Sequence, residues 1–392
     1  MTRTRPSSRL PALTGVRTLA ALAVCLTHAA FWTGHYTDDY LGRFWSRFEI
    51  GVALFFVLSG LLLFTPWVRA LQTAGRSDAV VSATGYPSVR RYAWHRAWRI
   101  LPAYWVGVIL VYLIYLHGDA GATGLGWSGF LRNMTFTQVY GYGHLHVGLT
   151  QMWSMTAEVA YYLALPLVAW PIAALVCRGR WRPEALVASL AVLLTVSPVW
   201  TLAVDGLPGV DPTARMWPPA FASWFVGGML LAAVRPLLRS WPATPSVLAA
   251  VLVFAVSAGA AAGEPTIIPS EAGATIFKHT LYLVAAVALI GPLTLPNGQA
   301  GGDRWWRNLC ASRPMIWFGE ISYEFFLVHV MVLELVMRML GYQTFQGSLW
   351  VAFAVTTVIS VPVAWLLHLG TYRLWRRDRG CPAPSDSGQS EL

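Results

Sequence analysis

Residues 16–32 read VRTLAALAVCLTHAAFW, an apolar run that carries the ionisable side chains Arg17 and His28. A run of this length is sufficient to cross the hydrocarbon core of a membrane as a helix. Ionisable residues at membrane depth are costly, so they usually face a protein interior or a water-filled cavity and mark a functional path. At about 100° per residue, the two positions return to nearly the same helix face, roughly 16 Å apart along the axis. We therefore expect them to line one wall of one cavity, the alternative for His28 being a hydrogen bond to a neighbouring helix.

The composition of the whole chain is that of an integral membrane protein. Of its 392 residues, 56% are hydrophobic and only 12% are charged, whereas soluble domains carry about 25% charged residues. The formal charge of +10 would suggest nucleic acid in a soluble protein, but here it reflects arginine-rich loops, and no nucleic-acid partner is expected. The four cysteines lack CxxC spacing, so neither a metal site nor a disulfide framework is indicated.

Apolar segments along the chain predict an all-α, polytopic bundle of about ten transmembrane helices. The predicted spans are Val16–Trp32, Ile50–Val68, Leu101–Leu116, Trp153–Val176, Glu184–Val204, Trp217–Val234, Ser246–Ala262, Thr275–Leu295, Ile316–Leu340 and Leu349–Trp375. They form one domain over residues 1–378, followed by a Pro-, Ser- and Gly-rich tail, residues 379–392, that is expected to be disordered.

The distribution of basic residues predicts the orientation, because cytoplasmic loops are enriched in Lys and Arg. Only six of the 28 basic residues fall on the predicted outer side, namely Arg43, Arg47, Arg132, Arg215, Lys278 and Arg338. Both termini are therefore predicted to be cytoplasmic, in a multi-pass protein of the inner (plasma) membrane.

The fourth predicted span begins with a polar cluster around Glu158 that includes Trp153, Ser154 and Tyr162. From the helix rise, His28 is expected about 12 Å and Glu158 about 9 Å below the outer face, so the two side chains are expected to meet. A carboxylate that accepts the imidazole N–H would leave the other ring nitrogen free to take a proton from a hydroxyl. The alternative is a structural glutamate that pairs with another polar group.

Four arginines, Arg90, Arg91, Arg96 and Arg99, precede the third predicted span. Guanidinium groups match phosphate oxygens in pairs, so this cluster is expected to hold a phosphorylated ligand at the cytoplasmic mouth. The alternatives are the general enrichment of basic residues on cytoplasmic loops and contact with anionic lipid headgroups. In the ninth span, His329 is predicted at the depth of His28 and either borders the same cavity or is a buried histidine of the bundle.

Five segments, in chain order, together resemble motifs of the membrane-bound acyltransferase-3 family of bacterial O-acyltransferases. Arg17 leading to His28 is similar to the family's Arg-x10-His motif, and residues 51–60, GVALFFVLSG, resemble its second-helix motif. The remaining similarities are carried by Arg96, Arg99, Leu101, Pro102 and Tyr104, by Trp153, Ser154, Glu158, Tyr161, Tyr162 and Pro166, and by Gly319, Ile321, Ser322, Tyr323 and His329.

This resemblance implies transfer of an acyl group, usually acetyl from acetyl-CoA, to a hydroxyl of a glycan, a glycolipid or a small natural product. It implies His28 as the base, supported by Glu158 and Arg17, with the acyl-CoA held by the arginine cluster as a donor substrate and no bound cofactor. The expected substrate contacts are Trp153, Ser154, Tyr162, Tyr323 and His329. Direct transfer and an acyl-histidine intermediate both remain open. The competing function is a transporter or flippase for a lipid-linked or anionic small molecule, which would need no acyl donor.

Overall fold

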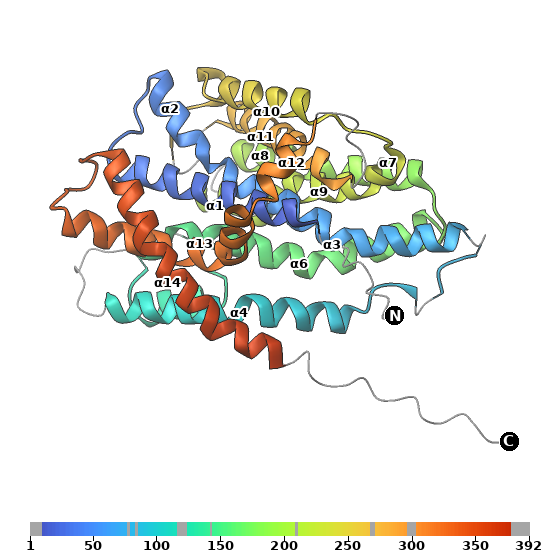
Figure 1. Cartoon of the computed structure of the whole chain (residues 1–392), viewed down its shortest axis with the longest axis horizontal. Helices are drawn as coiled ribbons and strands as arrows, with labels where there is room; N and C mark the ends of the chain where they lie inside the picture. The colour runs from blue at the N-terminus through green and yellow to red at the C-terminus, as the bar shows by residue number, and fades with distance from the viewer. Residues whose placement is uncertain are drawn as a thin grey trace.

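The structure is a computed structural model that describes residues 10–76, 79–82, 85–115, 124–141, 143–207, 211–266, 271–295 and 303–377. Over these ranges the secondary structure is entirely helical (Figure 1), which confirms the predicted all-α class. The predicted disordered tail, residues 379–392, lies outside the described residues.

In chain order, the α-helices are α1 (Pro11–Trp32), α2 (Tyr40–Ser46), α3 (Ile50–Arg76), α4 (Val89–Ile114), α5 (Gly126–Met134), α6 (Trp153–Pro171), α7 (Pro183–Leu194), α8 (Val196–Gly206), α9 (Ala222–Val234), α10 (Ala243–Ser257), α11 (Ala272–Thr294), α12 (Trp305–Cys310), α13 (Arg313–Met339) and α14 (Leu349–Arg377). Short 3-10 turns, η1 (Arg47–Glu49), η3 (Val147–Met152) and η6 (Pro218–Phe221), lead into α3, α6 and α9. A π-helical turn, η4 (Ile172–Val176), follows α6.

Each of the ten predicted spans overlaps one or more helices in the described part of the chain. In the described part of the chain, eight helical stretches are long and apolar enough to cross a membrane. Two other helices match the remaining predicted spans: α10 is apolar but has only 15 residues, and α13 has 27 residues. The number of helices that cross the membrane and the cytoplasmic location of both termini stay predictions.

The predicted start of the third span is wrong, because α4 begins at Val89 rather than at Leu101. Ser88 caps the helix through a hydrogen bond from the backbone N–H of Arg91 to its hydroxyl, at 3.4 Å. The Arg, Ala and Trp residues that follow have no helix breaker among them until Pro102. The arginine cluster therefore lies on the first turns of a long helix and not on a loop. Between the third and fourth predicted spans lie two further helical elements, α5 and η3.

Helix α1 packs between α3 and α13 (Figure 1). Gly51 of α3 lies so close to α1 that a Cβ atom there would be 2.3 Å from the carbonyl oxygen of Ala20. Gly319 of α13 is similarly placed, since its Cβ would be 2.0 Å from the carbonyl oxygen of Thr14. Small residues let helix backbones approach closely within a membrane. These two glycines therefore fix α1, with Arg17 and His28, between the helices that carry the rest of the site.

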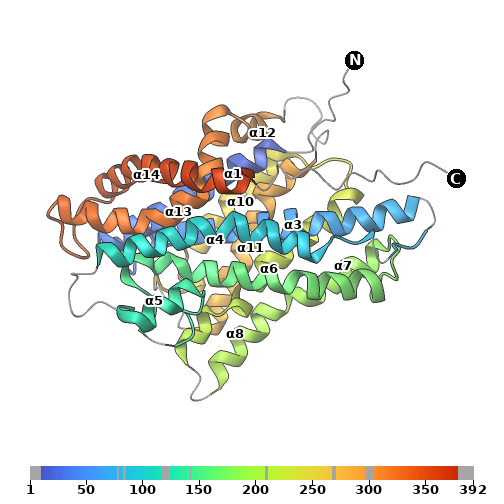
Figure 2. The ribbon, with the colours of Figure 1, turned by 90° about the horizontal axis from the view of Figure 1, so that it is seen from below.

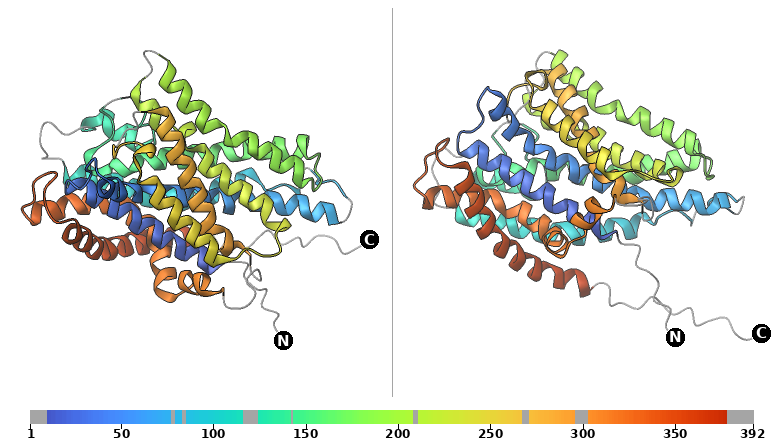
Figure 3. Two further views of the ribbon diagram at one scale, coloured as in Figure 1. Left: turned by 90° about the horizontal axis from the view of Figure 1, so that it is seen from above. Right: turned by 45° about the horizontal axis from the view of Figure 1, so that its top comes forward.

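The peripheral helices present apolar side chains outward. Helix α14 runs obliquely across α13 and also contacts α4 (Figures 1 and 2), while α10 packs beside α11 (Figure 3). Leu167 is 76% exposed, Val192 69% and Leu248 65%. An apolar surface of this extent would promote aggregation of a soluble protein, whereas it is the expected lipid-facing surface of a membrane protein.

Candidate active site

A cavity of about 140 Å³ lies among α1, α3, α4, α6 and α13. Its charged lining consists of Arg17 from α1, Arg96 and Arg99 from α4, and Glu158 from α6, and we call it the arginine cavity. The ion pairs among the described residues use Arg215, Lys278, Arg338 and His368 as their cations. The three cavity arginines thus have no carboxylate in ion-pair contact within the described chain, and they are available to an anionic ligand.

Glu158 is held in the arginine cavity by two hydroxyl groups. Ser59 Oγ donates a hydrogen bond to Glu158 Oε1 at 3.0 Å, and the Tyr162 hydroxyl donates to the same oxygen. The guanidinium carbon of Arg96 lies 5.9 Å from the centre of the Tyr162 ring, within the range of a cation–π interaction. Glu158 therefore organises the wall on which Arg96 rests.

The predicted contact between Glu158 and His28 is wrong. Glu158 lines the arginine cavity beside Ser59, whereas His28 lines a different cavity together with Glu49. Ser59 and Glu49 are separated by ten positions in the chain, roughly 15 Å along a helix. The depth estimate from the sequence treated each helix as upright, and it contained no information on which face of α6 turns towards α1.

The second cavity, of about 160 Å³, contains His28 and is called here the histidine cavity. It lies near the C-terminal end of α1, between the start of α3 and the start of α6, and it extends to α9 and α11. Val52 lines both cavities, so the two spaces lie on either side of this residue. The arginine cavity and the histidine cavity are therefore neighbours along the length of the bundle.

Hydrogen bonds fix the tautomers of His28 and His329. His329 Nδ1 lies 2.7 Å from the carbonyl oxygen of Phe326, which can only accept, so Nδ1 carries the proton and Nε2 is an acceptor. His28 Nδ1 lies 2.7 Å from the carbonyl oxygen of Val24 and 3.1 Å from His329 Nε2. Its N–H therefore points to two acceptors. In the neutral ring, His28 Nε2 is left as the acceptor, which is the form a general base requires.

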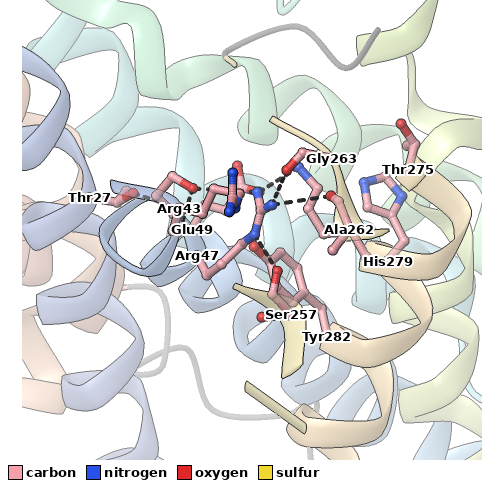
Figure 4. Close-up of polar contacts among 12 residues, drawn as sticks. Thr27, Arg43, Arg47, Glu49, Ser257, Ala262, Gly263, Thr275, His279 and Tyr282 are labelled. Atoms are coloured by element: carbon pink, nitrogen blue, oxygen red, sulfur yellow. Dashed lines mark hydrogen bonds and ion pairs between the residues drawn. The ribbon is translucent and has the colours of Figure 1, made fainter. Parts of the chain in front are cut away.

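A second charged cluster belongs to the histidine cavity (Figure 4). Lys278 Nζ donates to Glu49 Oε1 at 2.7 Å, and the Tyr282 hydroxyl donates to the same oxygen at 3.0 Å. The Lys278 side chain is only 8% exposed, whereas that of Glu49 is 35% exposed. Since Glu49 lines the cavity, part of its carboxylate remains open to a ligand.

Arg47, in the same 3-10 turn as Glu49, connects this turn to the end of α10. Its side chain is buried, and it donates to the carbonyl oxygens of Ser257, at 2.6 Å, and of Ala262 and Gly263 (Figure 4). The carbonyl groups at a helix C-terminus lack hydrogen-bond donors within the helix. The N–H groups of a guanidinium can donate hydrogen bonds to these oxygens. Arg47 thus ties the turn that carries Glu49 to the neighbouring helix.

Sequence reasoning missed Glu49, Lys278 and His279, all of which line the histidine cavity. Lys278 and His279 lie inside the predicted span Thr275–Leu295, and ionisable residues at membrane depth are the same signal that singled out Arg17 and His28. Lys278 is predicted on the outer side, and the structure buries its side chain in an ion pair with Glu49.

The predicted binding residues separate into groups. Arg90 and Arg91 are exposed and line neither cavity, in contrast to Arg96 and Arg99. Among the expected substrate contacts, Ser154, Tyr162 and Tyr323 line the arginine cavity and Trp153 lines the histidine cavity. His329 lines neither of these two cavities, and its Nε2 contacts Nδ1 of His28. The described residues contain no group of three or more His, Cys, Asp or Glu side chains placed to hold a metal ion.

On one side of Val52 lie arginines that form no ion pair with a carboxylate among the described residues, and on the other lies a histidine whose Nε2 is an acceptor. Guanidinium groups bind phosphate or carboxylate oxygens, and a positioned histidine removes a proton from a hydroxyl. This arrangement suits group transfer between an anionic donor and a hydroxyl acceptor.

Comparison with known proteins agrees with this chemistry. The sequence profile of the acyltransferase-3 family, described as an acyltransferase domain, matches residues 10–369. The chain is 26% identical over 364 residues to acyltransferase MdmB of Streptomyces mycarofaciens, covering 87% of this chain and 84% of the relative. It is also 26% identical over 362 residues to the putative peptidoglycan O-acetyltransferase YrhL of Bacillus subtilis (strain 168), covering 85% of this chain but 50% of that longer relative.

No solved structure matches this chain significantly. Because the family profile covers nearly the whole helical bundle, the chain belongs to the acyltransferase-3 family and is a membrane-embedded O-acyltransferase.

Proposed function

We propose that this enzyme transfers an acetyl group from acetyl-CoA to a hydroxyl of a glycan, a glycolipid or a small natural product in the inner (plasma) membrane. The Bacillus relative is named as a putative O-acetyltransferase, which favours acetyl over longer acyl groups. Membership of an acyltransferase family favours this function over the transporter or flippase that buried charges alone would also suit.

The observation that carries the proposal is the set of three cavity arginines, which form no ion pair with a carboxylate in the described part of the chain. Coenzyme A bears several phosphate groups, and Arg17, Arg96 and Arg99 line one cavity from two helices. Guanidinium groups bind phosphate oxygens through paired, charge-assisted hydrogen bonds. In the proposal, Arg96 and Arg99 hold the nucleotide, while Arg17 lies nearer the thioester.

His28 acts as the general base for the acceptor. Its Nε2 takes the proton of the acceptor hydroxyl, whose oxygen then attacks the thioester carbonyl to form a tetrahedral intermediate. When the carbon–sulfur bond breaks, the imidazolium returns the proton to the departing thiolate, so the ring is regenerated. The alternative mechanism is a double displacement with an acyl-histidine intermediate. In it, Nε2 of His28 first accepts the acyl group and then transfers it to the hydroxyl, so it uses the same residue.

Glu158 has a positioning role in this scheme. Its hydrogen bonds with Ser59 and Tyr162 hold the wall beneath Arg96, and it does not touch His28. It is therefore expected to influence donor binding rather than the basicity of His28.

Radiolabelled acetyl-CoA provides the test. Membranes from cells that produce the protein, supplied with an extract of the native organism, are expected to transfer label to lipid or polysaccharide material. Membranes with an equal amount of the His28→Ala variant should not. Equal labelling with and without the protein would contradict the proposed function.

A further inference from the structure

The arginine cavity and the histidine cavity are separated where α1 and α3 approach each other closely. A Cβ atom on Gly51 would collide with the carbonyl oxygen of Ala20 and with a side-chain methyl group of Val24. Both contacts fall between Arg17, which lines the arginine cavity, and His28, which lines the histidine cavity. The packing of α3 on α1 therefore narrows the space between the cavity arginines and the proposed base.

Val52, the residue after Gly51, lies at this narrow point. Among the described residues that line the two cavities, Val52 is the one that both share. The start of α6 passes the same level, because Trp153 lines the histidine cavity and Met155 lines the arginine cavity. We call this boundary between the two cavities, formed by Val52, Trp153 and Met155, the constriction.

The side chain of Val52 has little freedom to move out of the constriction. It is buried, and a β-branched residue in a helix strongly prefers one rotamer. The backbone of α3 cannot retreat either without breaking the close contact of Gly51 with α1. The width of the constriction therefore depends on the size of the side chain at position 52.

The proposed reaction requires the thioester to reach this constriction. Arg96 and Arg99 hold the nucleotide on one side, and His28 takes the proton of the acceptor hydroxyl on the other. The hydroxyl oxygen bonds to the thioester carbonyl carbon, the carbon–sulfur bond breaks, and His28 returns the proton to the departing thiolate. The reacting carbon and oxygen must first approach to about 3–3.5 Å. The acyl group therefore has to lie beside Val52 during transfer.

We propose that Val52 sets the size of the acyl group that this enzyme transfers, because its side chain leaves room in the constriction for a short acyl chain and excludes longer ones. An acetyl group ends one methyl group beyond the carbonyl carbon, whereas each further methylene has to be placed against the Val52 side chain. Extra methylenes in a tightly packed space force side chains off their rotamers and shift the backbone. This inference rests on the proposed function, since it assigns the selectivity for acetyl-CoA to one residue.

A series of donors tests this assignment. Membranes that contain the protein are supplied with an extract of the native organism as the source of the acceptor, and with acetyl-, propionyl- or butyryl-CoA radiolabelled in the acyl group. The label transferred to lipid or polysaccharide material is measured for equal amounts of protein and compared with membranes that lack it. The wild type should transfer acetyl at least about tenfold faster than butyryl, because one misplaced methylene changes the discrimination between substrates about 10- to 200-fold.

Substitutions of Val52 should change the selectivity in opposite directions. Val52→Ala should raise the ratio of butyryl to acetyl transfer about tenfold or more, because the smaller side chain leaves room for the longer acyl group. Val52→Leu should lower acetyl transfer about tenfold, while the Kd of the purified protein for coenzyme A stays close to that of the wild type, because the arginines are unchanged. Val57→Ala is the matched control, since Val57 is a buried valine of the same helix that lines neither cavity.

The contradicting results differ for the two proposals. Equal transfer of acetyl and butyryl by the wild type, an unchanged ratio in Val52→Ala, or the same rise of the ratio in Val57→Ala would overturn the role of Val52 and leave the use of acyl-CoA intact. Acetyl transfer at the wild-type rate by Val52→Leu, or loss of its coenzyme A binding, would do the same. Transfer from none of the three donors above the level of membranes that lack the protein would overturn the proposed function, and this inference with it.

Discussion

His28 Nδ1 lies 3.1 Å from His329 Nε2, so the two histidines join α1 to α13 through their rings. Because His329 Nδ1 donates to the Phe326 carbonyl, His329 presents an acceptor to His28 and orients its ring. His329 thus acts through His28 and lines neither the arginine cavity nor the histidine cavity.

His329→Ala should lower kcat about 10- to 100-fold, which is less than the roughly 100- to 10,000-fold contribution of a general base because His329 acts only through His28, and should leave the KM for acetyl-CoA unchanged. His329→Gln should recover part of the loss, because its amide oxygen can accept the N–H of His28. Initial rates over a series of acetyl-CoA concentrations give both constants. An unchanged kcat in His329→Ala would show that the ring contact has no part in turnover.

The cavity arginines are expected to act on donor binding. Arg96→Ala or Arg99→Ala should raise the KM for acetyl-CoA about tenfold, and the effect should shrink with S-acetylpantetheine, which lacks the nucleotide. Arg90→Ala and Arg91→Ala are the matched controls, because these exposed residues line neither cavity although they lie on the same helix. Equal losses with both donors would mean that the pair does not bind the phosphates.

Glu158→Gln should raise the KM for acetyl-CoA several-fold, because the wall formed by Tyr162 and Arg96 loses its carboxylate. The pH dependence of kcat should keep its shape, since Glu158 is not in contact with His28. Tyr162→Phe should act in the same direction. A displaced pH profile in Glu158→Gln would instead indicate that this carboxylate supports the base.

The close approach of α13 to α1 predicts a stability effect at Gly319. In Gly319→Ala, the new Cβ would meet the backbone of Thr14, and overpacking of this kind typically costs about 1–3 kcal/mol. Thermal unfolding should occur at a lower temperature than in the wild type. Gly273→Ala is the control, because open space surrounds that position of α11. An unaltered Tm in Gly319→Ala would mean that α13 moves away from α1 without a cost in stability.

The sequence was sufficient to locate the helices because long apolar segments are a strong one-dimensional signal. The same signal predicted that Arg17 and His28 line one wall of one cavity, and this prediction is wrong, because Arg17 lines the arginine cavity and His28 lines the histidine cavity. The partners of these residues were not predictable in the same way. The face of α6 that turns towards α1 depends on helix packing, and packing places Glu158 against Ser59. Glu49 was overlooked because it lies in a 3-10 turn just before an apolar run.

The central claim is that the arginine cavity binds the donor and that His28 carries out proton transfer. It is tested most directly by measuring coenzyme A binding and acyl transfer on the same preparation of His28→Ala. We predict a Kd for coenzyme A close to that of the wild type, together with a loss of acyl transfer of about a hundredfold or more. Arg99→Ala should show the opposite pattern. Its Kd for coenzyme A should rise, while saturating acetyl-CoA should restore the rate of acyl transfer. Acyl transfer at the wild-type rate by His28→Ala would contradict the claim.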